Sequence, residues 1–431
     1  MQESKNLMRK KSNLKQLMKQ TSRDGVSLKK LKNNKGNVIM QETLSHYFGY
    51  KSFRPGQEEI ITKILNHQHT LGVLPTGGGK SICYQVPGLM QGGTTIVISP
   101  LISLMKDQVD QLQAMGIQAA YLNSSLTHKQ QKEIEERIKR GAIQFLYVAP
   151  ERFENTFFLN LLRKIEIPLI AFDEAHCISK WGHDFRPSYQ SVIQKVFTLP
   201  QSFTIVALTA TATAEVQQDI MSKLSIGQND VVKTSTKRRN LIFKVNPTYQ
   251  RQKFVVDYVA NHEGQAGIIY CSTRKQVEEL HEALNSEKIK STIYHAGLTN
   301  KERIEAQNDF LYDRVEVVIA TNAFGMGIDK SNVRYVIHYN MPGDLESYYQ
   351  EAGRAGRDGL KSECILLFSE RDKGLHEYFI TVSQADDDYK DKMGEKLTKM
   401  IQYTKTKKCL EATIVHYFEP NENLEECNQC S

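Results

Sequence analysis

Short β-rich runs alternate with helix-length polar stretches from residue 70 to residue 210, and this alternation constrains the fold more than any other feature of the sequence. Each run ends in a polar or Gly-rich segment. Strands that alternate with helical patterns are typical of a parallel sheet covered by helices, so we predict a doubly wound α/β unit. Its strands are expected within TLGVLP (70–75), TTIVISP (94–100), QFLYVAP (144–150), PLIAFDEAH (168–176) and FTIVALTAT (203–211).

A second series of the same kind follows between residues 267 and 369. Between the two series, the periodicity lapses and charge clusters in KTSTKRRN, residues 233–240, where we place the join of two α/β lobes. After Ser369 the β signal stops, and residues 370–418 carry apolar residues at helical spacing. The strands of the second lobe are expected within GIIYCST (267–273), STIYHAGL (291–298), VEVVIATNAF (315–324), RYVIHYN (334–340) and ECILLFS (363–369).

The length of 431 residues allows two or three domains, each large enough to bury its own core. No run approaches the ~18 apolar residues that a membrane span needs, and the lysine-rich start lacks the apolar core of a secretory signal. Four of the seven cysteines are scattered singly, so we expect small buried hydrophobic residues and an intracellular, cytoplasmic protein with no membrane partner. These four are Cys83, Cys177, Cys271 and Cys364.

The net charge of +7 is concentrated at the N-terminus. Residues 1–40 contain eleven Lys or Arg against Glu3 and Asp24, a local charge of +9, so the remaining chain sums to −2. A basic stretch with few aromatic residues is more often a solvated, disordered tail than a specific binding element. The expected parts are a disordered tail at 1–40, a first lobe at 41–235, a second lobe at 236–370 and a helical module at 371–431.

The stretch LPTGGGKS, residues 74–81, lies between a predicted strand and a predicted helix, as a phosphate-binding loop must. Its glycines let backbone N–H groups turn toward phosphate oxygens at the positive end of the helix that follows. The usual pattern has Gly where this chain has Leu74, and a Gly-rich loop alone can be a tight turn with no ligand. We expect Lys80 to contact the β and γ phosphates of ATP and Ser81 to contact Mg²⁺. The candidate residues are Thr76, Gly77, Gly78, Gly79, Lys80 and Ser81.

The motif DEAH, residues 173–176, ends the apolar run PLIAF, and open α/β sheets bind ligands at such strand ends. We expect Asp173 to hold Mg²⁺ and Glu174 to orient and deprotonate the attacking water. Adjacent carboxylates at a strand end can also be no more than a solvated helix cap. The phosphate loop upstream makes a nucleotide site the better interpretation.

The segment YYQEAGRAGRDG, residues 348–359, supplies cations from the second lobe. Arg354 and Arg357 are three residues apart, which predicts that they share one face of a helix, with Gln350 at the start of the motif. They could form surface ion pairs only. Phosphoryl transfer, however, needs a cation as charge develops on the γ phosphate, and an arginine from a second lobe supplies it when the lobes close.

With their neighbours, these segments resemble the RecQ helicases, a branch of helicase superfamily 2, across residues 41–430. They run in the family order with the family spacing. The resemblance implies two RecA-like lobes and an ATP-dependent DNA helicase that travels 3′ to 5′ on single-stranded DNA in repair and recombination. The segments are FGYKSFRPGQEEII, PTGGGKSICYQ, SPLISLMKDQV, YVAPERF, DEAHCISKWGHDFRPSY, LTATAT, YHAGL, ATNAFGMGID and SYYQEAGRAGRDG.

The resemblance also implies roles for single residues. Thr209 and Thr211 match the segment that links the ATP state to DNA contact, and Asp329 closes a motif at the lobe interface. In the family's adenine-recognition motif an aromatic ring stacks on the base and a glutamine reads its edge. The matching residues are Tyr50, Arg54 and Gln57.

The loop after DEAH contains the only tryptophan of the chain, Trp181. In the family this aromatic-rich loop couples single-stranded DNA to hydrolysis, and stacked aromatic faces accept any base at about 1 to 3 kcal/mol each. In an anonymous protein, Trp181 and Phe185 would more often anchor the loop to the core. The candidate residues for DNA coupling in this loop are Trp181, His183, Phe185 and Arg186.

The last cysteines resemble the first three ligands of the four-cysteine zinc module that follows RecQ lobes, and the fourth would be expected near position 433. Leu410 stands where the family usually has an arginine. A structural Zn²⁺ site needs four ligands, and His416 lies too far along a predicted helix to replace one. We therefore expect poor zinc retention and fraying of residues 405–431. The three candidate ligands are Cys409, Cys427 and Cys430.

Two other functions stay open. An RNA helicase of the DEAH or DEAD type shares the lobes and the phosphate chemistry, but Gln350 stands where the DEAD-box motif begins with His. A translocase that hydrolyses ATP on DNA without separating strands has the same motifs. The expected cofactors are ATP, Mg²⁺ and Zn²⁺, and the expected partner of a monomeric chain is single-stranded and partly duplex DNA.

Overall fold

The computed structural model describes residues 35–100, 102–182, 184–325, 330–420, 426–427 and 429–430 of the chain. Most of the predicted tail, residues 1–34, lies outside these residues. Residues 35–40, which we also expected in the tail, instead begin helix α2 (Lys35–Thr43). Met40 is buried there against Ile61 and Val86, so the packed structure begins earlier than the sequence pattern indicated.

In the described part of the first lobe, seven parallel strands form one sheet in the order β3-β4-β2-β5-β6-β1-β7. Each of the five expected runs contains one strand. The two unexpected strands, β3 and β7, are the edges of the sheet. The strands are β1 (Thr70–Val73), β2 (Thr95–Ile98), β3 (Ala119–Leu122), β4 (Phe145–Val148), β5 (Leu169–Phe172), β6 (Thr204–Thr209) and β7 (Val231–Lys233).

Apolar residues line both faces of this sheet because helices cover both faces. Ile170 and Phe172 of β5 belong to one apolar cluster, whereas Leu169 and Ala171, which point the other way, belong to a second. The covering helices are α3 (Gln57–Leu65), α4 (Ile82–Gln91), α5 (Ile102–Ala114), α6 (His128–Lys139), α7 (Thr156–Leu162), α8 (Pro187–Val196) and α9 (Ala214–Leu224).

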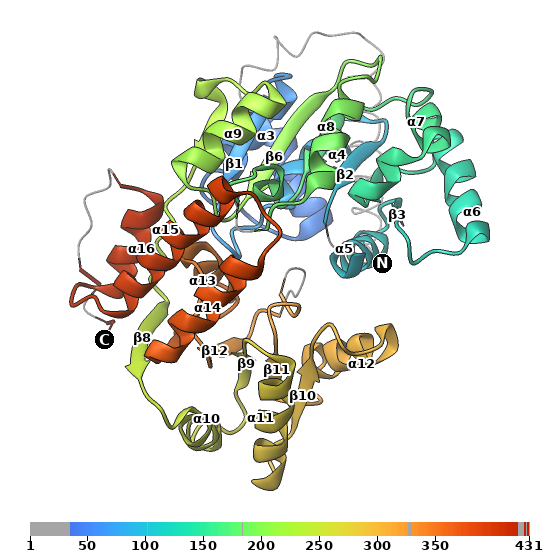
Figure 1. Ribbon diagram of the computed structural model, residues 1–431. Coiled ribbons are helices and arrows are strands. Elements are labelled where there is room, and N and C mark those ends of the chain that lie inside the picture. The colour runs from blue at the N-terminus through green and yellow to red at the C-terminus, as the bar shows by residue number, and fades with distance from the viewer. Residues whose placement is uncertain are drawn as a thin grey trace.

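The second lobe repeats this plan with six described strands, all parallel, in the order β10-β11-β9-β12-β13-β8. Figure 1 shows the two lobes one above the other. The strands are β8 (Leu241–Pro247), β9 (Ala266–Tyr270), β10 (Ser291–Tyr294), β11 (Val317–Ala320), β12 (Val333–His338) and β13 (Ser362–Phe368). The helices are α10 (Arg251–Ala260), α11 (Arg274–Ser286), α12 (Asn300–Leu311) and α13 (Leu345–Ala352).

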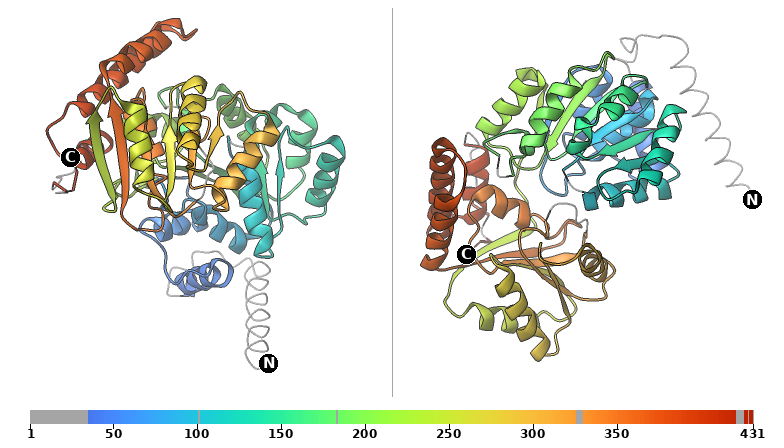
Figure 2. Two further views of the ribbon diagram at one scale, coloured as in Figure 1. Left: turned by 90° about the horizontal axis from the view of Figure 1, so that it is seen from below. Right: turned by 45° about the vertical axis from the view of Figure 1, so that its right-hand side comes forward.

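Three further helices follow the second sheet: α14 (Glu370–Val382), α15 (Asp387–Thr404) and α16 (Leu410–Phe418). Leu397 of α15, together with Ile414 and Phe418 of α16, joins the apolar core of the second lobe. Our expectation that residues 405–431 are frayed is therefore wrong for α16, because its apolar face is buried. Figure 2 shows these helices beside the junction of the two lobes.

The predicted fold class, two parallel-sheet α/β lobes with a helical C-terminal segment, is confirmed. In the part of the chain that the structure describes, no helix combines the length and apolar character needed to cross a membrane.

Candidate functional site

The predicted phosphate loop, residues 74–81, connects the end of β1 to the start of α4. Gly77 and Gly79 have φ angles of +79° and +73°, which residues with side chains rarely adopt. A Cβ atom on Gly78 would lie 2.8 Å from the carbonyl oxygen of Pro75. The tight turn of this loop in front of α4 therefore requires all three glycines.

Two side chains from outside the loop hold its carbonyl groups. Arg54 donates a hydrogen bond to the carbonyl of Gly77. Nε2 of Gln57 donates to the carbonyls of Gly78 and Gly79, at 3.1 and 2.9 Å. In a planar trans peptide the following N–H group points away from the carbonyl, so the N–H groups of Gly79 and Lys80 face away from Gln57. A loop that binds an anion needs N–H groups that do not face the side chains holding its carbonyl groups, and this loop meets that condition.

Two of the three predicted adenine-recognition residues contact the phosphate loop, and the third does not. Arg54 and Gln57 contact the phosphate loop, and Oε1 of Gln57 also accepts the N–H of Arg54 at 2.8 Å. The Gln57 side chain is buried, whereas Tyr50 is 53% exposed. Reading a base edge would require the Gln57 amide to exchange partners, so that role stays a prediction.

The two predicted catalytic carboxylates follow β5 directly. Asp173 is 8% exposed, and its Oδ1 accepts the N–H of Glu174 at 3.1 Å. Burial and the neighbouring charge of Glu174 raise the pKa of Asp173 to about 7, while Lys80 acts in the opposite direction. Glu174 itself has a left-handed backbone, with φ of +47°, which turns its side chain out of the strand direction. The carboxylates thus sit in a buried site beside a cation, where a divalent metal ion would be well compensated.

His176 connects these carboxylates to the end of the neighbouring strand β6. Its Nδ1 lies 3.4 Å from Oε2 of Glu174 and 3.0 Å from the hydroxyl oxygen of Thr209. The Thr209 hydroxyl donates to the carbonyl of Thr211 and accepts its N–H. All of these polar groups except Glu174 lie in residues that are almost fully buried. The predicted coupling residues Thr209 and Thr211 are therefore joined to the Glu174 carboxylate through one histidine.

The predicted arginines do not share a helical face. Helix α13 ends at Ala352, and both Arg354 and Arg357 lie in the turns that follow it. Gly356 lies between the two arginines and has φ of +56°, a left-handed conformation that breaks the helical path needed to put both on one face. We call residues 353–359 the arginine turn.

The arginine turn nevertheless reaches the phosphate loop. A Cβ atom on Gly353 would lie 3.0 Å from Cβ of Thr76. A cavity of about 150 Å³ lies between the lobes, and residues predicted from three separate motifs line it. Those predicted residues are Thr76, Gly77, Gly79, Lys80, Ser81, Asp173, Glu174, Gln350, Arg354 and Arg357.

The aromatic loop lies beside the C-terminal helices. Trp181 is half-buried and packs on the core of the first lobe, with Nζ of Lys180 and of Lys392 located 5.1 and 6.0 Å from its ring centre. Phe185 is half-exposed. Arg186 pairs with Asp184 at 3.0 Å and donates to the carbonyl of Pro100. Two of the predicted residues, His183 and Asp329, lie outside the described residues.

Lys396 of α15 also contacts this loop. Its Nζ donates to the carbonyl of Trp181 at 2.7 Å and lies 2.9 Å from Oε1 of Glu346, near the start of α13. Both members of the ion pair are buried. Lys396 therefore connects the aromatic loop of the first lobe to the helix that precedes the arginine turn.

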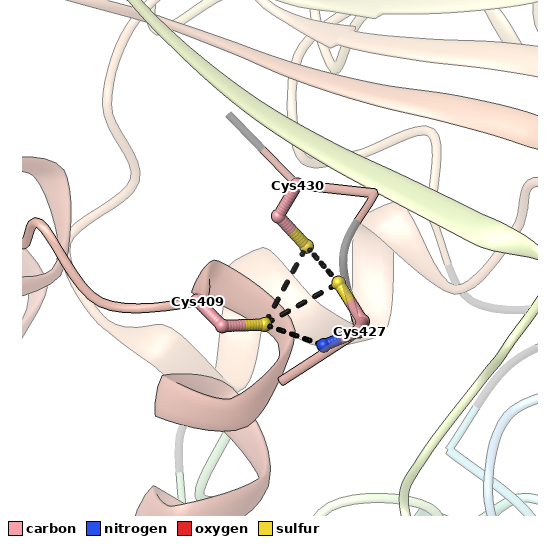
Figure 3. A group of neighbouring side chains, drawn as sticks. All are labelled: Cys409, Cys427 and Cys430. Carbon is pink, nitrogen blue, oxygen red and sulfur yellow. Dashed lines mark hydrogen bonds between the residues drawn. The ribbon is translucent and has the colours of Figure 1, made fainter. Parts of the chain in front are cut away.

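The three C-terminal cysteines come together as predicted (Figure 3). Sγ of Cys409 lies 3.3 Å from that of Cys427 and 4.0 Å from that of Cys430, and the latter two are 2.9 Å apart. Sulfur ligands of one Zn²⁺ lie about 3.8 Å apart, given Zn–S bonds of about 2.3 Å in a tetrahedron. Two of the three separations are shorter than this, so the cysteines could supply three of the four ligands after a small outward shift. His416 is exposed and is not a member of the group.

Sequence reasoning missed two residues of this region. Arg238 was placed in the join between lobes, and Lys396 in the helical module, with no role for either. The only signal for Arg238 is the charge cluster KTSTKRRN, which does not distinguish a half-buried arginine from an exposed one.

Three protein families match successive parts of the chain. Residues 54–220 match the DEAD/DEAH box helicase family, residues 250–359 match the helicase conserved C-terminal domain, and residues 370–431 match the RecQ zinc-binding family. Together with the cavity between two parallel-sheet lobes, these matches define a helicase of superfamily 2.

Among curated proteins, the chain is 48% identical over 391 residues to the ATP-dependent DNA helicase RecQ of Bacillus subtilis, covering 90% of this chain and 66% of that protein. The chain belongs to the RecQ family. It is also 43% identical to a B. subtilis protein named "Probable ATP-dependent DNA helicase RecS", covering 80% of this chain and 70% of that protein. For the RecQ protein of Haemophilus influenzae, at 42% identity over 90% of this chain, the chain spans 62% of its length.

Solved structures share the fold at low identity. The Mycobacterium smegmatis helicase Lhr, solved with single-stranded DNA and AMP-PNP, has a TM-score of 0.61 at 17% identity, covering 85% of this chain and 58% of that chain. S. cerevisiae Dbp5, solved with RNA and ADP BeF3, has a TM-score of 0.62 at 19% identity, covering 86% and 99%.

Proposed function

We propose that the chain is the motor of an ATP-dependent DNA helicase, which moves 3′ to 5′ on single-stranded DNA and separates duplex DNA. One observation carries this proposal. The phosphate loop, the DEAH carboxylates and the arginine turn, which lie far apart in the sequence, line a single cavity between the lobes. Hydrolysis at such a site depends on how the two lobes meet.

Each polar group of the cavity has a step to perform. Lys80 would neutralise the β and γ phosphates, and Glu174 would orient the attacking water and accept its proton. Arg354 and Arg357 would stabilise the charge that develops on the γ phosphate. Ser81 and Asp173 would hold Mg²⁺, which supplies further neutralisation of the phosphates when bound.

DNA would act on this site through two routes. The first is the contact from Glu174 through His176 to Thr209 and Thr211. The second is the aromatic loop, whose Trp181 and Phe185 offer stacking surfaces beside the carboxylates. Both routes include Glu174 or the loop that follows it. A base stacked on the aromatic loop would therefore be able to change the position of Glu174, the residue proposed to activate water.

A parallel assay separates this proposal from its rivals. ATP hydrolysis is measured with single-stranded DNA and with RNA of the same sequence, and unwinding is measured on duplexes with a 3′ or a 5′ tail, with Lys80→Ala as the inactive control. We expect DNA-stimulated hydrolysis and unwinding of the 3′-tailed duplex. Stimulation without unwinding would indicate a translocase, and stronger stimulation by RNA would indicate an RNA helicase.

The remaining features belong to the same proposal. ATP, Mg²⁺ and, at the three cysteines, Zn²⁺ are the cofactors that the donor groups fit. The partner is single-stranded and partly duplex DNA, bound by a monomeric chain inside the cell during repair or recombination.

A further inference from the structure

The guanidinium group of Arg238, in the segment between the two sheets, touches both lobes at the nucleotide site. Nη1 donates to the carbonyl of Thr76 in the phosphate loop at 2.6 Å. Nη2 donates to the carbonyls of Ala355 and Gly356 in the arginine turn, at 3.1 and 3.0 Å. One planar group therefore bonds the backbone of the phosphate loop to the backbone of the arginine turn.

Asn240 fixes the orientation of this guanidinium group. Its Oδ1 lies 3.3 Å from Nε of Arg238, and its Nδ2 donates to the carbonyls of Gly356 and Leu360 at 2.8 and 3.0 Å. Burial lowers the pKa of Arg238, and the nearby charge of Arg54 adds to this effect. Removing a cation from water costs free energy, so a guanidinium group is seldom placed among carbonyl groups unless it makes several hydrogen bonds there.

Arg238 also lies close to Gly77, a phosphate-loop residue that lines the cavity. A Cβ atom on Gly77 would lie 3.4 Å from Cγ of Arg357 and 3.6 Å from Nη1 of Arg238. The stem of Arg357 and the guanidinium of Arg238 thus both lie beside Gly77 of the phosphate loop. A displacement of Arg238 would move the arginine turn against that loop.

We propose that Arg238 is a positioning residue for ATP hydrolysis: it sets the distance between the phosphate loop and the arginine turn, and thereby places Arg354 and Arg357 at the γ phosphate. This inference rests on the proposed ATP-driven function. Arg238 itself lines the adjoining pocket behind the loop and does not line the cavity that contains the carboxylates. It acts through the two arginines and not on the phosphate.

Only an arginine can make these bonds. The planar fork presents separate N–H groups in fixed directions, whereas a lysine ammonium is a compact point charge on a flexible stem. Arg238→Lys keeps the charge and most of the length but cannot reach carbonyls on both lobes at once. The neighbouring Arg239 is exposed, so Arg239→Ala is a control that removes a similar charge at the next position.

The first test is steady-state ATP hydrolysis with saturating single-stranded DNA, together with binding of a fluorescent ATP analogue. For Arg238→Lys we expect kcat to fall on the order of 10- to 100-fold, the usual effect of a small misplacement of catalytic groups. The dissociation constant of the analogue should change less than about threefold, and Arg239→Ala should match the wild type. Thermal unfolding of each variant shows whether it is folded.

The second test is a double-mutant cycle with Arg357→Ala. Because Arg238 is proposed to act by placing Arg357 as well as Arg354, the loss of kcat in the double variant should be clearly smaller than the product of the two single losses. Multiplied effects of the two substitutions, or an unchanged kcat in folded Arg238→Lys, would overturn the inference. A wild-type chain without DNA-stimulated hydrolysis would instead reject the proposed function, so the two failures are distinguishable.

Discussion

Nδ1 of His176 lies 3.0 Å from the hydroxyl oxygen of Thr209, and this contact joins the ends of two adjacent strands, β5 and β6. The same ring nitrogen lies 3.4 Å from the Glu174 carboxylate. His176 and Thr209 are both fully buried, so water cannot replace the contact. A change at the end of β6 is therefore transmitted to the residue proposed to activate water.

Removing the Thr209 hydroxyl should weaken this transmission. We expect Thr209→Val to bind ATP normally and to lose about tenfold or more of its stimulation by single-stranded DNA, since a buried hydrogen bond of about 1 to 3 kcal/mol is lost. The measurement is ATP hydrolysis with and without DNA. Thr204→Val is the matched control, because Thr204 is buried in the same strand and its hydroxyl has no hydrogen-bond partner among the described residues. Equal stimulation in both variants would contradict the proposed link.

The nucleotide site itself is tested by two substitutions. Lys80→Ala should abolish ATP hydrolysis without unfolding the lobe, because the β and γ phosphates lose their nearest charge. Glu174→Gln should still bind ATP and lose roughly 10² to 10⁴ in turnover, the usual contribution of a positioned base. Turnover close to that of the wild type in either variant would reject the assignment. Analogue binding and turnover, measured together, give the answer.

The aromatic loop should affect coupling and not basal hydrolysis. We expect Trp181→Ala and Phe185→Ala to keep basal ATP turnover and to reduce its stimulation by single-stranded DNA, because a stacked base contributes about 1 to 3 kcal/mol. Phe157→Ala is the control, since Phe157 is an aromatic residue of the same lobe that is 84% exposed. Full stimulation in both loop variants would mean that the loop serves only to pack against the core.

The buried pair of Lys396 and Glu346 should contribute to stability in a pH-dependent way. Burial and the charge of Asp344 raise the pKa of Glu346, and Lys396 opposes this. Without the lysine, the pKa rises further, and a carboxyl group with a raised folded-state pKa destabilises the protein as the pH increases through that range. Lys396→Met should therefore lower the free energy of unfolding by about 3 to 5 kcal/mol at pH 8, and by less at pH 5.

Lys405→Met is the control for this measurement. Lys405 and Glu370 form an ion pair at 2.7 Å, but both side chains are more than half exposed. An exposed ion pair contributes at most about 1 kcal/mol to the free energy of unfolding, because solvent screens its charges. Chemical denaturation of both variants at the two pH values makes the comparison. A loss in Lys396→Met that is the same at pH 5 and pH 8 would contradict the role of Glu346.

Metal retention should be weak with three thiolates. We expect the 431-residue chain to lose zinc to a chelator readily, because a structural site has four ligands. Adding a few residues that carry a fourth cysteine should raise zinc content to one ion per chain and protect the segment after Phe418 from proteases. One tightly held zinc ion per unextended chain would show that the ligand set has been misjudged.

The sequence predicts the central strands of both sheets and the edge strand β10, but it misses the other three edge strands, β3, β7 and β8. Central parallel strands such as β5 are apolar on both faces, so LIAF stands out as a continuous run. Strand β3 contains two alanines, β7 has three residues and ends in the exposed Lys233, and β8 follows a charge cluster that hides its start. The spacing of apolar residues alone does not identify such strands.

The site shows the same division. The phosphate loop and the DEAH carboxylates are local motifs, and the structure places both at strand ends as predicted. The positions of Arg354 and Arg357 depend on the left-handed Gly356, which a spacing of three residues does not reveal. The contacts of Arg238 and Lys396 join segments more than a hundred residues apart in sequence, so they follow only from the packing of the lobes.

Strand β8 begins directly after the segment that joins the lobes, and it pairs with β13 in unbroken register from Leu241 opposite Ser362 to Pro247 opposite Phe368. A pull from the first lobe therefore acts along the axis of this strand. Tension along the strand acts on all the hydrogen bonds of the ladder at once, in shear. A pull across the strand would instead break them one after another. The chain thus enters its second lobe through a strand whose hydrogen bonds would share a load applied along the strand.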